Sequence, residues 1–303
     1  GPGIRTTVFF KGCTLACDWC HNPESIDARP QVQWADWKCI GCGACATVCP
    51  GGPASRAGGG RGTAAGEAQG CRLCGRCVDE CPAAARELLG REWTLDALVG
   101  EVAKDAAYFR KSGGGVTASG GEPTVQAAFV TAFLARCRDQ GMHAALDTCG
   151  MCSESVLLAT AAAADLVLFD LKILDPDLHR RHTGQSNERI LSNLLALAQQ
   201  VRAGRGPAAI WVRTPLVPGA TATDLHVHAI GRFIVQNVAD VVQRWDLCAF
   251  NNLCRDQYRR LGVAWPYDAT PLLTAAELAH FRDTAVASGV PDALIRTSGP
   301  VGI

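Results

Sequence analysis

Residues 4–20 read IRTTVFFKGCTLACDWC, an apolar stretch that runs directly into a loop with three cysteines. Ile4 to Phe10 are largely apolar or β-branched and end just before a Gly-Cys turn, which predicts a β-strand. The loop has the spacing Cys13-x3-Cys17-x2-Cys20. The first predicted unit of the fold is thus a strand with three thiols at its carboxyl end.

The rest of the chain alternates between strand-like and helix-like stretches. Further strands are predicted at 115–119, 144–148, 166–171, 208–213 and around 241–249, and helices at 94–111, 125–140, 153–163, 186–202, 224–238 and 274–288. Such alternation is typical of an α/β fold with a parallel sheet. Six strands are fewer than the eight of a closed barrel, which favours a partial (β/α)6 barrel. A doubly wound sheet stays open as an alternative, because a strand count does not distinguish the two.

Length, composition and charge exclude several classes of protein. With 303 residues, 48% of them apolar, the chain can bury a large core, which excludes a disordered protein or a miniature scaffold. Lys plus Arg and Asp plus Glu both number 29, so no broad basic field predicts a nucleic-acid partner. No apolar stretch reaches the roughly 18 to 20 residues of a membrane helix. We expect a cytoplasmic protein that binds neither nucleic acid nor membrane.

Cysteines are concentrated in one part of the chain, since eleven of the sixteen lie between Cys13 and Cys81. Two matched runs of four each end in Cys-Pro, with the spacing of bacterial two-cluster ferredoxins. In that pattern the fourth cysteine of each run binds the other cluster. One [4Fe-4S] cluster is then expected on Cys39, Cys42, Cys45 and Cys81, and the other on Cys71, Cys74, Cys77 and Cys49. A pair of zinc sites is the alternative.

The composition changes around these two runs. Cys and Gly rise between about Trp34 and Pro82, and residues 51–70 are dominated by Gly, Ala and small polar residues, which predicts a flexible loop. We therefore expect a ferredoxin-like insert over residues 35–82, inside a barrel domain formed by residues 1–34 and 83–303.

The first three cysteines predict a different kind of site. Three thiolates on a cubic cluster leave one iron open to a substrate or cofactor. A structural zinc site completed by His21 is the alternative reading.

Several motifs together resemble the radical S-adenosylmethionine (SAM) enzymes. The Cys-x3-Cys-x2-Cys loop is similar to their cluster motif, Gly120-Gly121-Glu122-Pro123 to their GGEP motif, and Asp147 and Asp170-Leu171-Lys172 to acidic and Asp-x-Lys contacts of one subfamily. All lie at the carboxyl ends of predicted strands, at the face where barrels place active sites. The resemblance implies that Cys13, Cys17 and Cys20 form the catalytic cluster site. It implies SAM contacts at Trp19, Gly120, Gly121, Glu122, Asp147, Asp170, Lys172 and Arg213.

A closer resemblance is to the glycyl-radical enzyme activating enzymes. It rests on residues 1–6, 19–24, 113–123 and 147–150, and on Arg213-Thr214-Pro215-Leu216-Val217-Pro218-Gly219. It implies an anaerobic oxidoreductase with three [4Fe-4S] clusters that cleaves SAM to a 5′-deoxyadenosyl radical. This radical would install a glycyl radical on a partner enzyme, with a flavodoxin or ferredoxin as electron donor. Residues 248–252, CAFNN, depart from the Pro-Tyr-His segment of some members, so no histidine is carried over.

Two other functions remain open at this stage. One is a radical SAM enzyme that acts on a small molecule or RNA, and the other is an iron-sulfur electron carrier. Trp19 is equally consistent with stacking on adenine and with ordinary packing. The seven histidines show no shared metal-binding pattern and are interpreted as surface or loop residues. The other five cysteines are interpreted as small buried hydrophobes or spare thiols: Cys137, Cys149, Cys152, Cys248 and Cys254.

Overall fold

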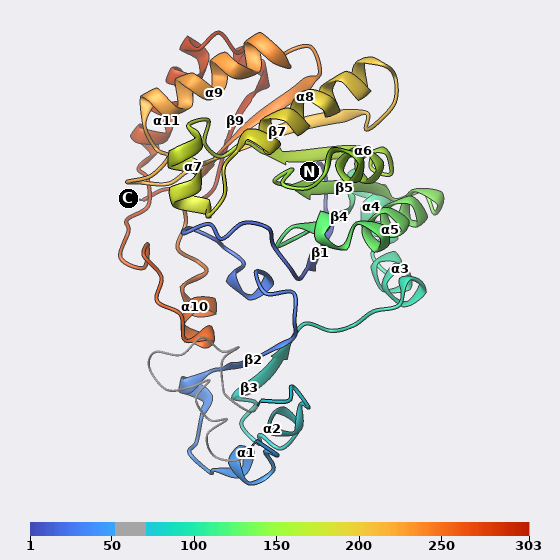
Figure 1. Ribbon diagram of the computed structural model, residues 1–303, viewed down its shortest axis with the longest axis vertical. Helices are drawn as coiled ribbons and strands as arrows, with labels where there is room; N and C mark the ends of the chain where they lie inside the picture. Colours follow the sequence, from blue (N-terminus) through green and yellow to red (C-terminus); the bar gives the residue numbers. More distant parts are fainter. Residues whose placement is uncertain (52–70, 303) are drawn as a thin grey trace.

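The computed structural model describes residues 1–51 and 71–302, so most of the predicted loop at 51–70 lies outside the described residues. Its main sheet has seven parallel strands (Figure 1). The strands are β1 (Arg5–Phe10), β4 (Gly115–Gly120), β5 (His143–Thr148), β6 (Leu166–Asp170), β7 (Ala209–Leu216), β8 (Val242–Ala249) and β9 (Ile295–Ser298). β9 was not predicted, and the expected count of six strands is corrected to seven.

The strand order decides between the two predicted architectures. Neighbours in the sheet follow one another in the chain, from β1 through β4 to β9, and the order never reverses. A doubly wound sheet needs such a reversal. The sheet is therefore singly wound, as in a barrel, and seven strands leave it short of the eight of a closed one.

Helices form an outer arc around the strands (Figure 1). Those that cover the sheet are α3 (Leu95–Ala103), α4 (Ala106–Ser112), α5 (Ala127–Asp139), α6 (Glu154–Ala162), α8 (Glu188–Arg202), α9 (Asp224–Asn237) and α11 (Ala275–Ala287). The predicted helix 94–111 is two helices, although its predicted start is correct, since Thr94 Oγ1 accepts a hydrogen bond from Ala97 N. Two helices were not predicted: α7 (Pro176–Thr183) and α10 (Arg255–Leu261).

The two faces of β7 show how the sheet separates core from site. Ile210, Val212 and Leu216 are buried in the main core under the helices. Trp211 and Arg213 point to the opposite, inner face and are only half-buried. This alternation follows from the two-residue period of a strand. It directs the charged side chains at the strand ends toward the inside of the partial barrel.

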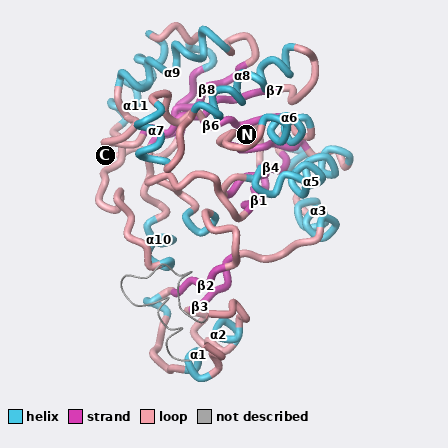
Figure 2. The backbone as a smooth tube through the Cα atoms, in the orientation of Figure 1, coloured by secondary structure: helices cyan, strands magenta, loops and turns pink. Residues whose placement is uncertain are grey.

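Residues 31–51 and 71–89 form a smaller unit at one end of the molecule (Figure 1). Its stem is an antiparallel pair of β2 (Gln31–Trp34) and β3 (Arg86–Leu89), which Figure 2 shows in magenta, apart from the main sheet. Beyond the stem lie the short helices α1 (Ala44–Thr47) and α2 (Arg76–Asp79). Gly43 and Gly75 precede them, both with φ of 74°, so the two cysteine runs adopt matching local structures.

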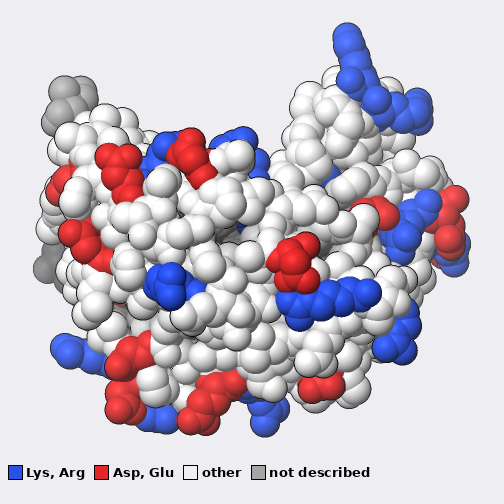
Figure 3. Space-filling model, turned by 90° about the horizontal axis from the view of Figure 1, so that it is seen from above, with Lys and Arg blue, Asp and Glu red and all other residues white. Residues whose placement is uncertain are grey.

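The surface agrees with a net charge of zero. Figure 3 shows acidic and basic side chains interspersed over the face seen from above, without a broad patch of one sign. In the part of the chain that the structure describes, no helix is both long and apolar enough to cross a membrane.

Candidate active site

A cavity of about 350 Å³ lies at the carboxyl ends of the parallel strands. It brings together all three cysteines of the first loop: Cys13, Cys17 and Cys20. It also brings together seven of the eight predicted SAM contacts: Trp19, Gly120, Gly121, Asp147, Asp170, Lys172 and Arg213. The exception is Glu122. Residues from five strand ends therefore meet at one place, as expected for a barrel active site.

Hydrogen bonds from distant segments hold the cysteine loop in place. The backbone N–H groups of Ala16 and Asp18 donate to Thr183 O and His182 O at the end of α7, at 2.9 and 3.0 Å. Burial raises the pKa of Cys17 to about 11 and that of Cys20 to about 12. Both thiols are thus protonated at neutral pH, and a metal that binds them must displace the protons.

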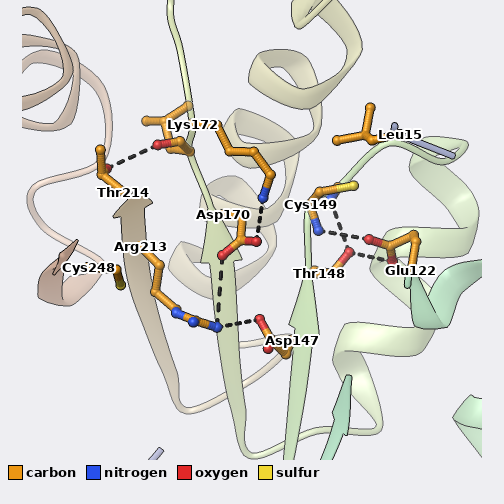
Figure 4. Close-up of polar contacts among 12 residues, drawn as sticks. Leu15, Glu122, Asp147, Thr148, Cys149, Asp170, Lys172, Arg213, Thr214 and Cys248 are labelled. Atoms are coloured by element: carbon orange, nitrogen blue, oxygen red, sulfur yellow. Dashed lines mark hydrogen bonds and ion pairs between the residues drawn. The ribbon is translucent and has the colours of Figure 1, made fainter. Parts of the chain in front are cut away.

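Charged side chains form a compact network at the inner strand ends (Figure 4). Arg213 Nη1 lies 2.8 Å from Asp147 Oδ1 and 3.9 Å from Asp170 Oδ1, and Lys172 Nζ lies 2.5 Å from Asp170 Oδ2. Burial alone would lower the pKa of Lys172, but the attraction of Asp170 outweighs it and raises that pKa. Burial would raise the pKa of Asp170, but Lys172 and Arg213 together lower it. Both cations and Asp170 are therefore charged at neutral pH.

Glu122 lies outside the lining of this cavity, and its contact with SAM stays a prediction. Its side chain is 0% exposed, and both carboxylate oxygens accept hydrogen bonds from within the protein (Figure 4). The donors are Thr124 N at 3.0 Å, Thr124 Oγ1 at 2.7 Å, Thr148 Oγ1 at 2.7 Å and Cys149 N at 2.8 Å. The carboxylate therefore has no free surface toward the cavity. It fixes the turns after β4 and β5 instead.

The two glycines of this motif allow close backbone approach. A Cβ on Gly121 would come within 2.3 Å of Gly12 O and 2.5 Å of Ser25 O. Gly120 has a φ of +123°, a backbone conformation that residues other than glycine rarely adopt. Any larger residue would push apart β4 and the cysteine loop, so both positions keep the backbone of the motif at the cavity surface.

Trp19 is 6% exposed and packs against neighbouring rings. Its ring centroid lies 5.6 Å from that of His182 and 6.5 Å from that of Tyr267. The packing interpretation is thus observed, while stacking on adenine stays a prediction.

The burial of the histidines and of the remaining cysteines agrees only in part with the prediction. His179 and His226 are buried in helices and are not surface or loop residues, because tertiary packing covers them. Cys137, Cys149 and Cys254 are buried as expected, whereas Cys152 and Cys248 are half-buried. Cys149 and Cys248 line the cavity, which sequence spacing did not indicate.

A second cavity, of about 250 Å³, lies in the small unit and is lined by Cys39, Cys42, Cys45 and Cys81. This is the crossed set that the sequence predicts. Cys77 lies within electrostatic range of Cys49 and Cys71, both of which add to the effect of burial in raising its pKa. Within residues 1–51 and 71–302, no three His, Cys, Asp or Glu side chains converge to hold a single metal ion.

Comparisons with known families agree with both parts of this description. Residues 65–229 match the radical SAM superfamily, and residues 38–85 match the 4Fe-4S dicluster domain. Among solved structures, Streptococcus suis SuiB bound to precursor peptide SuiA has a TM-score of 0.58 over 98% of this chain and 49% of its own. At 10% identity this likeness shows the fold alone.

Curated relatives carry the comparison further. The chain is 36% identical to the pyruvate formate-lyase 2-activating enzyme of Escherichia coli, over 96% of this chain and 86% of that protein. It is also 36% identical to the trans-4-hydroxy-L-proline dehydratase activating enzyme of Clostridioides difficile, over 86% and 83%. The cysteine loop, the cavity and these relatives agree, and the chain belongs to the radical SAM superfamily, among the glycyl-radical enzyme activating enzymes.

Proposed function

We propose that the cavity is the site at which this activating enzyme binds SAM on a [4Fe-4S] cluster held by Cys13, Cys17 and Cys20. The observation that carries the proposal is the meeting of three half-buried cysteines with a charged network in one cavity. When bound and reduced, such a cluster supplies the electron that splits SAM into methionine and a 5′-deoxyadenosyl radical, which takes a hydrogen atom from a glycine of the partner enzyme.

The residues of the cavity would bind and orient SAM. Lys172 carries three N–H donors and gives one to Asp170, which leaves two for the SAM carboxylate. Asp147 and Asp170 would accept hydrogen bonds from amino or hydroxyl groups. Arg213 helps to keep Asp170 charged for that task. Glu122 would act through the turns that it holds, and Trp19 would border the adenine.

We further propose that residues 35–82 are a ferredoxin-like insert with two [4Fe-4S] clusters, which makes three in the whole chain. Cys39, Cys42, Cys71 and Cys74 are exposed, so both cluster sites are open to an external donor. A reduced flavodoxin or ferredoxin fits that role, in an anaerobic cytoplasm. An electron carrier alone would not need the first cysteine loop or its cavity, and the curated relatives favour a protein substrate over a small molecule or RNA.

The test is an anaerobic assay of SAM cleavage. The chain is reconstituted with iron and sulfide, reduced with dithionite and mixed with SAM, and 5′-deoxyadenosine is quantified. We expect it from the native chain and not from Cys17→Ala. The matched control is Cys137→Ala, which removes a buried thiol of α5 away from the cavity. Absence of the product from the native chain with all clusters loaded would refute the proposed reaction.

A second measurement addresses the partner. Candidate glycyl-radical enzymes are incubated with the reduced, SAM-loaded protein and examined by electron paramagnetic resonance. A glycyl radical signal that depends on Cys17 identifies the substrate protein. If deoxyadenosine forms in step with turnover of a small molecule or RNA instead, the alternative radical SAM function replaces the activase.

A further inference from the structure

A cluster of aromatic rings lies behind the cysteine loop, and three of its members, Tyr258, Trp265 and Tyr267, belong to no motif in the sequence. It contains Trp19, Phe250, Tyr258, Trp265 and Tyr267, none more than 9% exposed. The rings of Tyr258 and Trp265 are stacked, with centroids 5.1 Å apart and planes at 16°. Tyr258 comes from α10, and Trp265 from the segment that follows it.

Two rings of this aromatic cluster carry polar atoms that reach the cysteine loop. Tyr258 Oη donates to Cys20 O at 3.0 Å, and Trp265 Nε1 donates to Asp18 O at 3.0 Å. These carbonyls stand on either side of Trp19. Buried carbonyls need a partner, because an unpaired one costs about 1–3 kcal/mol. The two side chains supply partners that the short loop does not supply itself.

The opposite side of the loop is held by α7, through the bonds from Ala16 N and Asp18 N. The peptide groups around Trp19 are thus fixed from two directions, by α7 and by the aromatic cluster. Cys20 N also donates to Cys17 O at 3.0 Å, which links the last two cysteines in one turn. A side chain that fixes the Cys20 carbonyl therefore fixes this turn.

We infer that Tyr258 and Trp265 are positioning residues that hold the cysteine loop in its cluster-binding conformation and set the reduction potential of its cluster. The inference rests on the proposed function, since it requires the cluster at Cys13, Cys17 and Cys20. Partners that orient the ligands of a metal raise its affinity, and their loss typically costs about 10- to 100-fold. Hydrogen bonding and exclusion of water also tune cluster potentials.

The decisive comparison removes single polar atoms and keeps the rings. Tyr258→Phe removes the donor to Cys20 O. The matched control is Tyr267→Phe, which removes a hydroxyl from the same aromatic cluster. It is suitable because the Tyr267 hydroxyl has no hydrogen-bond partner among the described residues. Trp265→Phe and the double variant with Tyr258→Phe test the second bond. All are made in the full chain, reconstituted to the holoprotein.

Two readouts isolate the site cluster from those of the insert. The first is the part of the electron paramagnetic resonance spectrum that changes on addition of SAM, followed in a potentiometric titration. The second is the rate at which this SAM-responsive signal is lost to a chelator. The denaturation midpoint of the apoprotein reports on general stability.

We expect Tyr258→Phe to lose the SAM-responsive cluster about tenfold faster than Tyr267→Phe. The midpoint potential of this cluster should be lower in Tyr258→Phe than in Tyr267→Phe, because the variant lacks the hydroxyl donor that stabilises the negative charge added on reduction. A tenfold change in the reduction equilibrium would shift it by about 59 mV. The double variant should show faster cluster loss and a larger shift in potential than either single variant, while the clusters of the insert load normally.

Equal behaviour of Tyr258→Phe and Tyr267→Phe would overturn the inference. So would loss of all clusters in proportion to a lowered denaturation midpoint, because that result indicates a general packing role. If Tyr258→Phe fails to fold, Trp265→Phe gives the same comparison at Asp18 O. The native chain separates the two hypotheses, since its deoxyadenosine yield tests the proposed function independently of either variant.

Discussion

Arg213 Nη1 lies 2.8 Å from Asp147 Oδ1, so one ion pair joins the middle of β7 to the carboxyl end of β5 across the intervening β6. Asp170 on β6 stands 3.9 Å from the same guanidinium nitrogen. The cation therefore balances two carboxylates that converge on the cavity, and the three strand ends keep their relative positions without SAM.

Replacing this cation should destabilise the apoprotein. Arg213→Met leaves Asp170 with Lys172 and Asp147 with only the hydrogen bond from Ser119 Oγ, and loss of a hydrogen bond to a charged group costs about 1.5–3 kcal/mol. Urea unfolding measures the change. Adding Asp147→Asn should restore part of the stability lost in Arg213→Met. Arg213→Lys should be less stable than the native protein, because the lysine ammonium lacks the guanidinium fork. Native stability in Arg213→Met would refute the structural role.

Glu122→Gln should lower the free energy of unfolding by about 2–3 kcal/mol, even without SAM. The amide nitrogen of Gln would face N–H or O–H groups that now donate to the carboxylate, and it cannot accept from them. The exposed Glu154→Gln is the matched control. Unchanged stability together with weaker SAM binding would instead indicate direct contact between Glu122 and SAM.

The apoprotein should lose stability as the pH falls from about 6.5 to about 4. Burial lowers the pKa of His226 to about 4, so in this window the unfolded chain takes up a proton that the folded chain does not. The loss attributable to His226 is about 2–3 kcal/mol, since each unit of pKa difference is worth about 1.36 kcal/mol. Urea unfolding at pH 7 and pH 4.5 should show a smaller difference in His226→Gln. If the difference between pH 7 and pH 4.5 is as large in His226→Gln as in the native protein, the pH dependence arises elsewhere, for example at His179, whose pKa is also lowered by burial.

The proposed crossed ligand sets, if they hold two clusters, predict which substitutions are equivalent. Cys45→Ala and Cys81→Ala should each remove the same cluster, about one third of the iron, and the double variant should lose no more. Cys49→Ala should remove the other cluster. Iron analysis and electron paramagnetic resonance check this, with Cys137→Ala as the control. Additive losses from Cys45→Ala and Cys81→Ala would mean that each run of four binds its own cluster.

The strand ends and their motifs could be predicted from the sequence, because each apolar strand is followed directly by cysteine, glycine or charged residues at a characteristic spacing. α10 could not, because four of the seven residues in RDQYRRL are charged and only Tyr258 and Leu261 are buried. Its structure depends on tertiary contacts with the cysteine loop. β9 has a single buried residue, Ile295, so its pattern carries little signal either.

Two other differences have local causes. The predicted helix 94–111 is interrupted at Asp105, whose side chain accepts a hydrogen bond from Thr6 Oγ1 at 2.6 Å, so a distant strand influences a local break. For Glu122, the motif identified an important carboxylate but not its direction. Only the packing of Thr124, Thr148 and Cys149 shows that it points into the protein.

The bonds from Tyr258 and Trp265 to the cysteine loop join residues 238 and 247 positions apart in the chain. During synthesis the amino-terminal cysteines therefore emerge long before the side chains that enclose them. The cysteines of the insert, in contrast, all lie between residues 39 and 81. Iron delivered to the growing chain would meet a complete ligand set for the insert first. A cluster at Cys13, Cys17 and Cys20 would gain its full enclosure only after Tyr258 and Trp265 have been added and have packed against the loop.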